Sequence, residues 1–208
     1  MTDQEFIKNC KEKGLTGTQA KHCLELYKGS KDIKWSFEKA KLNFNKYQMH
    51  EARLALQNGL TREQVEFFYK PEFDSNRMQQ ARFAFENGLT KEQVGAFYKP
   101  EFNSSQTQEA RFAFEDKLTK EQVEAFYKPE FKWHQMRQAR FAFENGLTLE
   151  QVEAFYKPDF DSSQMQQARE AFENGLSIEQ VKEILGFVED KNPVHEVENS
   201  TTLMDFFN

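Results

Sequence analysis

Residues 78–106 read MQQARFAFENGLTKEQVGAFYKPEFNSSQ, and this stretch decides the fold because the flanking sequence repeats it. The copies cover residues 49–77, 78–106, 107–135, 136–164 and 165–193, so the period is 29 residues and no gap is needed. One arginine keeps the register in every copy (Arg53, Arg82, Arg111, Arg140 and Arg169). A fixed period of this length is typical of repeat proteins, whose neighbouring units share one core.

Each copy predicts two short helices. In residues 78–106 the first helix is expected to end at Gly88, which can adopt the left-handed conformation. Thr90 and Gln93 form a capping box for the second helix, and Pro100 excludes its continuation. Helices of this length are marginal alone in water, so the copies must stack to be stable.

We therefore expect an all-α fold, an α-solenoid of stacked two-helix repeats with capping ends. Residues 1–48 are predicted to form an N-terminal helical cap, in which residues 2–28 resemble a divergent first copy and residues 32–46 a half repeat without its second helix. Residues 49–186 hold the five repeats. From residue 187 to 208 the periodicity is lost, which predicts a flexible acidic tail ending in an apolar motif.

Composition narrows the class of protein. The formal net charge is -6 and the pI about 5.4, which makes direct nucleic-acid binding over the whole surface an unfavourable interpretation. The first residues, MTDQEF, have no basic and apolar leader, and no apolar run approaches the roughly 20 residues of a membrane span. With only two cysteines, the chain reads as a cytoplasmic protein with no membrane contact.

The arginine column allows two interpretations. It can be a basic ladder along a binding groove, or a set of ion pairs with acids in the same copy, and we favour the ion pairs. Their expected partners are the glutamates four residues later and the loop acids (Glu86, Glu115, Glu144 and Glu173, with Glu72, Glu101, Glu130 and Asp159).

The position after each arginine also changes in a regular way. It runs from Leu54 through Phe83, Phe112 and Phe141 to Glu170 in the last copy. An exposed aromatic rail for a peptide or for bases is one interpretation. Burial between stacked copies is the one we favour, because the last copy turns polar where no neighbour would follow.

Departures from the repeat are the best candidates for a partner-binding surface. Lys117 stands where the other copies have glycine, at a cost on the order of 1 kcal/mol for a left-handed lysine. Lys132, Trp133 and His134 replace Asn-Ser-Ser before the next copy. Tryptophan and a basic residue on a loop are typical of a binding hot spot, although Trp133 packing on its neighbour as a cap is an equal alternative.

No catalytic motif is present. The four histidines lie in dissimilar contexts, and no phosphate loop or nucleophile motif occurs, so we expect a non-enzymatic protein without a cofactor. Cys10, His22 and Cys23 could meet across an N-terminal hairpin as zinc ligands, but their spacing is not that of a known zinc site. Buried free cysteines are the favoured interpretation.

The C-terminal tail holds a short apolar motif, Leu203, Met204, Phe206 and Phe207. It resembles the sliding-clamp-binding peptide of replication and repair proteins, with Ser200 where that peptide has glutamine. The other interpretation is a tail that folds back on the last repeat.

Residues 70–89, KPEFDSNRMQQARFAFENGL, resemble short helical repeats of the form DPEFxxxQMxxIRxGLExGLDV. Such repeats occur in uncharacterised proteins of Gram-positive bacteria, their phages and their conjugative elements. The resemblance covers residues 49 to about 184, and Gly-Leu-Thr replaces the usual Gly-Leu-Asp. It implies a phage or mobile-element setting and no particular activity.

The expected function is a protein-binding helical-repeat scaffold, with an inhibitor of a host defence nuclease, of anti-CRISPR type, as its specific form. The alternative is an accessory protein of DNA replication or transfer, recruited to a sliding clamp by the tail. A third hypothesis is an acidic protein that occupies a DNA-binding groove by charge.

Overall fold

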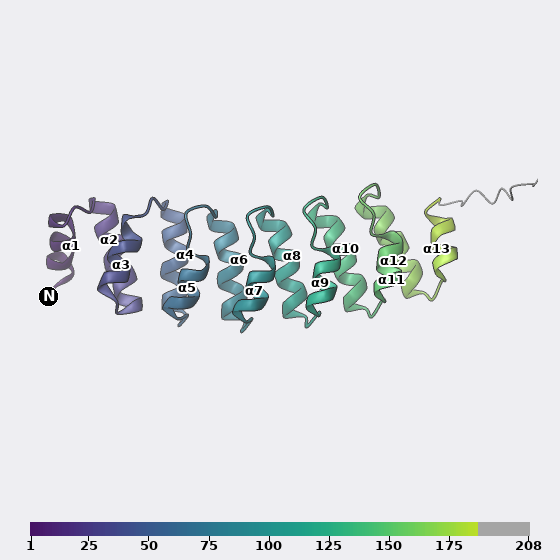
Figure 1. Cartoon of the computed structure of the whole chain (residues 1–208), viewed down its shortest axis with the longest axis horizontal. Coiled ribbons are helices and arrows are strands. Elements are labelled where there is room, and N and C mark those ends of the chain that lie inside the picture. The colour runs from purple at the N-terminus through teal and green to yellow at the C-terminus, as the bar shows by residue number, and fades with distance from the viewer. Residues whose placement is uncertain (187–208) are drawn as a thin grey trace, which may run out of the picture.

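The computed structural model describes residues 1–186, and within them it contains helices and no strand, which confirms the all-α prediction (Figure 1). The helices are α1 (Asp3–Glu12), α2 (Gly17–Ser30), α3 (Ile33–Lys41), α4 (Lys46–Gln57), α5 (Arg62–Phe68), α6 (Ser75–Glu86), α7 (Lys91–Phe97), α8 (Ser104–Glu115), α9 (Lys120–Phe126), α10 (Trp133–Glu144), α11 (Leu149–Phe155), α12 (Ser162–Glu173) and α13 (Ile178–Ile184). Among these residues no helix is long and apolar enough to cross a membrane.

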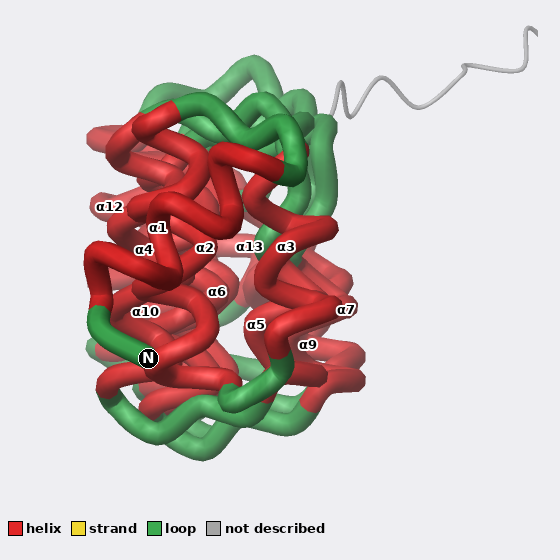
Figure 2. Tube along the Cα trace, turned by 90° about the vertical axis from the view of Figure 1, so that its left-hand side faces the viewer, coloured by secondary structure: helices red, strands yellow, loops and turns green. Residues whose placement is uncertain are grey.

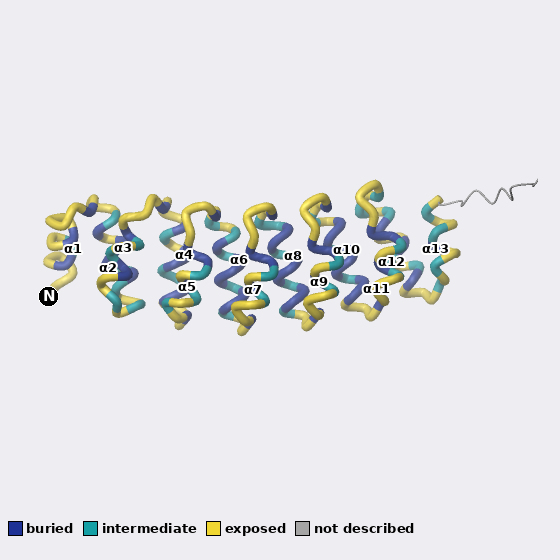
Figure 3. Tube along the Cα trace, in the orientation of Figure 1, coloured by how far each residue is buried: buried dark blue, intermediate teal, exposed yellow. Residues whose placement is uncertain are grey.

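The helices lie in two rows, which are seen end-on in Figure 2. The A row consists of the longer helices α2, α4, α6, α8, α10 and α12, and each packs against the next. The B row consists of α3, α5, α7, α9, α11 and α13. From α5 to α11, each B-row helix packs against the A-row helix before it and the one after it. Buried residues lie mostly within the helices, whereas the loops along both edges are largely exposed (Figure 3).

The turns of the repeat form as its residues predict. Asp74 accepts a hydrogen bond from the backbone of Arg77 and begins α6. Gly88 follows that helix with φ +84°, in the left-handed region that glycine enters without strain. Thr90 and Gln93 form the predicted capping box of α7, because each side chain bonds the other residue's backbone N–H.

The loop after each B-row helix is anchored in the core. Phe102 is buried and stacks on the ring of Tyr127 with centroids 3.7 Å apart. The Tyr127 hydroxyl donates a hydrogen bond of 2.8 Å to the backbone carbonyl of Phe97, in the preceding copy. The same pair of contacts recurs at Tyr98 and Tyr156, so aromatic side chains join each of these three copies to the one before it.

Polar side chains also join neighbouring A-row helices at both ends. Near the N-terminal ends, Gln106 donates to the carbonyl of Phe131 at 2.7 Å. At the C-terminal ends, Asn87 donates to Glu115 at 2.8 Å. Because both ends bond in the same register, the A-row helices run parallel, with their N-terminal ends along one edge and their C-terminal ends along the other.

The N-terminal segment differs from the sequence-based expectation. Helix α2 packs against α4 as α4 packs against α6, and α3 takes the first place in the B row. Phe44 stacks on Tyr69 at 3.7 Å, as the loop phenylalanine does in later copies. Residues 20–48 are therefore a complete degenerate copy, and α1 is an additional helix packed on α2. The resemblance of Gly14-Leu15-Thr16 to Gly88-Leu89-Thr90 reflects the shared turn chemistry of two helical hairpins.

Candidate functional site

The outer face of the A row carries a stripe of partly buried phenylalanines. Phe85 points to the B row and packs against Phe67, while Phe83, about 200° around the same helix, points away from it. Two guanidinium groups lie over the Phe83 ring, that of Arg82 at 4.4 Å and that of Arg111 at 5.5 Å from the ring centroid. We call this surface the Phe–Arg stripe, and it consists of Phe83, Phe112, Phe141, Arg82, Arg111, Arg140 and Arg169.

The stripe corrects the expectation of burial between copies. Ala81, Ala84 and Phe85 fill the space between neighbours, and they are buried. Phe83, like Phe112 and Phe141, is only partly buried, because guanidinium groups and not apolar side chains cover its ring. The last copy has the exposed Glu170 at this position. The phenylalanines of the stripe therefore end at α10, and Arg169 on α12 covers the last of them.

Each arginine of the stripe is held by acceptors on two helices. Arg82 donates from Nη1 to Glu86 at 2.9 Å, which confirms the predicted pairs four residues apart. Its Nε donates to Glu51 on the preceding A-row helix, also at 2.9 Å. The later arginines bond Gln80, Glu109 and Gln138 in the same way. These side chains take the place of the predicted partners in the loops, Glu72, Glu101, Glu130 and Asp159. The reason is that each arginine faces the middle of the preceding A-row helix and not the loop.

The electrostatics of the stripe follow from these pairs. Burial opposes the charge of Arg82, but its hydrogen bonds to Glu86 and Glu51 leave its pKa raised. Burial raises the pKa of Glu144 even though the Arg140 guanidinium opposes that shift. The guanidinium charges are thus matched by carboxylates within the protein. The stripe therefore combines partly exposed phenylalanines with arginines whose charges are already paired.

Trp133 extends this surface toward the N-terminal edge of the A row. Its ring stacks on His134 with centroids 3.7 Å apart and lies 4.5 Å from the Arg137 guanidinium. Trp133, Arg137 and Phe141 follow one another at four-residue spacing, so they lie on one side of α10, and all three are partly buried. Trp133 therefore packs on its own helix and also contributes to the outer face.

Lys132 takes the N-cap position of α10, where the other full copies have asparagine or aspartate. Its side chain has no acceptor and cannot cap the helix. Its backbone N–H is bonded by the side chain of Gln135 at 2.8 Å. Lys132 and His134 are both exposed beside Trp133. The structure therefore brings these three predicted residues together at one end of the Phe–Arg stripe.

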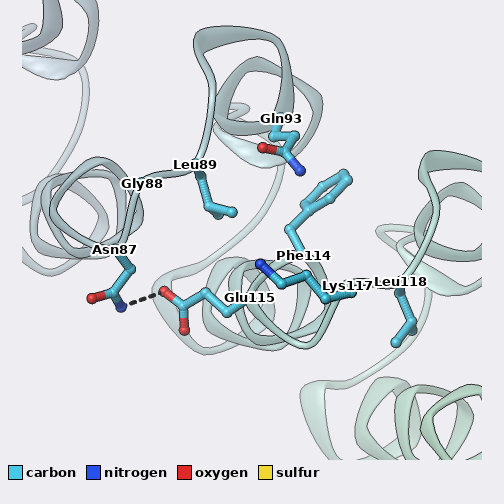
Figure 4. A pocket seen from close by; sticks show the side chains of 8 residues that line it. All are labelled: Asn87, Gly88, Leu89, Gln93, Phe114, Glu115, Lys117 and Leu118. Atoms are coloured by element: carbon cyan, nitrogen blue, oxygen red, sulfur yellow. Dashed lines mark hydrogen bonds between the residues drawn. The ribbon is translucent and has the colours of Figure 1, made fainter.

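Lys117 lies elsewhere. It adopts φ +70° in the turn after α8, as its place in the repeat predicts. It lines a cavity of about 350 Å³ with Leu89, Gln93 and Phe114 (Figure 4). Because the A-row helices are parallel, Lys117 is at the opposite edge of the row from Trp133, roughly a helix length or 18 Å away. A similar cavity between Asn58 and Glu86 shows that the feature belongs to the repeat and not to Lys117 alone.

The remaining candidates have simpler positions. Leu203, Met204, Phe206 and Phe207 lie outside the described residues. Cys10 and Cys23 are buried free thiols, as favoured, with sulfur atoms 3.8 Å apart. Burial, together with the charge and hydrogen bond of Cys10, raises the pKa of Cys23 to about 12, so its thiolate is strongly disfavoured.

His22 does not join the two thiols. Its Nε2 lies 2.6 Å from the hydroxyl of Tyr69. Within residues 1–186 no three His, Cys, Asp or Glu side chains form a group that could hold a metal ion.

The sequence contains a signal for the outer face in the spacing of two phenylalanines. Phe83 and Phe85 are two residues apart in a helix, so they cannot both face the same neighbour. One of them could therefore lie on the outer side of the A row, next to the arginine column. Comparisons with models of known families, with curated proteins and with solved structures give no match for this chain.

Proposed function

We propose that the chain is an α-solenoid that acts as a non-enzymatic scaffold and binds a protein partner through the outer face of its A row. Support for the solenoid comes from the repetition of the same contacts in successive copies. The tyrosine bond to the preceding copy, the asparagine bond and the arginine bond each recur at constant separations of 30, 28 and 31 residues.

The Phe–Arg stripe is the observation that carries the binding function. Aromatic residues and arginine are enriched in interface hot spots, and here they form one continuous row with Trp133 at its edge. Helices that pack 8 to 10 Å apart place Phe83 and Phe141 on the order of 20 Å apart. That length suits a protein interface of ordinary size.

A protein fits this surface better than a nucleic acid does. Bases bind aromatic residues by stacking on an open ring face, but two guanidinium groups lie over each of the Phe83 and Phe112 rings. Phosphates need free cations, and these arginines already bond carboxylates. The edges of aromatic rings carry partial positive charge. A partner surface with aliphatic side chains and carbonyl oxygens would complement them.

Photo-crosslinking tests this proposal directly. A photoreactive amino acid replaces Gln108, which lies one turn before Phe112 on α8, or Glu124, a matched position on the exposed side of α9. We expect a covalent adduct with a discrete protein in source cells from position 108 and none from position 124. Phe112→Asp should remove the adduct while preserving the helical content. Equal adducts from both positions, or an adduct that persists in Phe112→Asp, would exclude the A-row face as the binding surface.

The specific form that we propose is an inhibitor of a host defence nuclease, of anti-CRISPR type. Its support is the resemblance of residues 70–89 to repeats found in phage and mobile-element proteins. An interference assay in the source bacterium tests it, with Phe112→Asp as the matched variant. Expression of the chain should increase phage or plasmid survival, and the variant should not. Equal survival with and without the chain would reject the inhibitor while leaving the scaffold open to the crosslinking test.

A further inference from the structure

The N-terminal end of the molecule contains an apolar groove that the repeat does not use. It has a volume of about 520 Å³ and lies between α1, α2 and α3. The stacked rings of Phe6 and Tyr27 line it, 5.3 Å apart, together with Phe37. Met1 and Ile33 stand at its rim with 81% and 48% of their surfaces exposed. A groove of this size can take two or three apolar side chains.

The charge around the groove is positive. Residues 1–48 hold ten lysines against six acidic residues, in a chain that is acidic as a whole. Lys13 and Lys34 line the groove itself, and among the described residues neither has an ion-pair partner. The neighbouring Lys41 is already paired with Glu38. The groove therefore favours a segment that combines large apolar side chains with carboxylates.

Residues 196–208, EVENSTTLMDFFN, have this composition. Leu203, Met204, Phe206 and Phe207 supply apolar side chains, and Asp205 supplies a carboxylate between them. We propose that this segment of one molecule binds the N-terminal groove of a second molecule, so that the chains associate head to tail.

Chain length favours a second copy over the same chain. Helix α13 is at the opposite end of the row from α1 (Figure 1). The six A-row helices span roughly 40 to 50 Å at 8 to 10 Å per interval, and the groove lies beyond α2. Leu203 lies seventeen positions after Gly186, and a fully extended chain of that length reaches roughly 58 Å. The segment after Gly186 could reach the groove of its own molecule only if it were almost fully extended. It can reach the groove of a neighbouring molecule without being extended.

Sedimentation velocity over a range of concentrations tests the proposal on the full chain. The average mass should rise with concentration above that of a monomer. Ile33→Asp in the groove and the double variant Phe206→Asp/Phe207→Asp in the tail should each weaken association by about tenfold or more. Leu42→Asp is the matched control, because Leu42 is also exposed, at 38%, but does not line the groove. It should associate like the unchanged chain.

A charge exchange gives the second test. Lys34→Glu and Asp205→Lys should each weaken association, and an equimolar mixture of the two should recover less than the variant that carries both changes in one chain. In the mixture, opposite charges meet only when the groove of one variant binds the tail of the other. In the double variant they meet between any two molecules. A chain that stays monomeric at all concentrations, or whose association is unaffected by the tail variants, would overturn the proposal. So would a monomer in which Ile33→Asp exposes the tail to protease, since the groove would then hold its own chain's tail.

Discussion

Nε2 of His22 lies 2.6 Å from the hydroxyl of Tyr69, in the core where the degenerate N-terminal copy meets the first regular one. In later copies the equivalent hydroxyl donates to a backbone carbonyl, as Tyr98 does to Phe68. Burial lowers the pKa of His22 to about 4 and raises the pKa of Tyr69, so both groups are neutral at pH 7 and share one hydrogen bond whose direction is set by the tautomer of the imidazole.

This pair predicts a loss of stability in mild acid. The unfolded chain takes up a proton at His22 near pH 6.5, whereas the folded chain resists it until about pH 4. The free energy of unfolding should therefore fall as the pH drops from 6.5 to 4, by about 2 kcal/mol between pH 7.5 and pH 5. Urea unfolding at these two values measures it, with His22→Gln as the control. An equal pH dependence in both chains would show that His22 is not the group responsible.

The buried side chain of Glu109 should stabilise the middle of the A row, and two substitutions test how much it contributes to the free energy of unfolding. Its side chain is 0% exposed, and its two oxygens accept hydrogen bonds from Arg137 and Arg140. Glu109→Gln should cost about 1 kcal/mol of unfolding free energy, because Gln80 holds the equivalent arginine in the preceding copy. Glu109→Leu should cost about 3 kcal/mol, since it leaves the Nε of the buried Arg140 without an acceptor. Similar losses for both variants, measured by chemical unfolding, would contradict this ranking.

Replacement of Lys117 by glycine should stabilise the protein. A lysine at φ +70° is strained where glycine is not, and the equivalent turns use Gly88 and Gly146. Lys117→Gly should raise the free energy of unfolding by about 1 kcal/mol, and Gly88→Lys should lower it by a similar amount. Thermal unfolding of the two variants measures both changes. If Lys117→Gly lowers stability instead, the lysine side chain makes a contact that outweighs its backbone strain.

The alternative function depends on the tail and has its own test. A sliding-clamp ligand predicts that the full chain binds the purified sliding clamp of its host and that removal of residues 202–208 abolishes binding. Fluorescence anisotropy of the labelled chain measures it, with Leu203→Asp as a point variant. Absent binding, or binding that survives the deletion, would end that alternative.

The regular copies could be predicted closely because their local chemistry determines their turns. Gly88, Thr90 and Gln93 define where one helix ends and the next begins, and the structure has these boundaries. The N-terminal copy was harder, because Ser36 and Trp35 occupy places taken elsewhere by valine and glutamine. Its 29-residue register survives mainly in Phe44 and in the capping residues Thr16 and Asn45.

The outer face could not be derived from the period alone. Arg82 and Phe83 recur together whether the ring is buried by a neighbouring copy or covered by a neighbouring guanidinium. Only the distance from Arg111 to the Phe83 ring distinguishes these arrangements, and it depends on how closely α6 and α8 approach. The sequence also does not show that Lys117 and Trp133 lie at opposite edges of the A row. Their separation follows from the parallel direction of the A-row helices, which the repeat pattern does not specify.

Because the hydrogen bonds between copies have a constant spacing in the sequence, whole copies could be added or removed while these bonds are kept. Arg111 bonds Gln80 and Arg140 bonds Glu109, each 31 residues back. Removing residues 107–135 would bring Arg140 to the same separation from Gln80, with an acceptor of the kind that Arg111 already uses. Gene duplication or loss of one unit could therefore lengthen or shorten the outer face in steps of a single helix, without inventing a new junction.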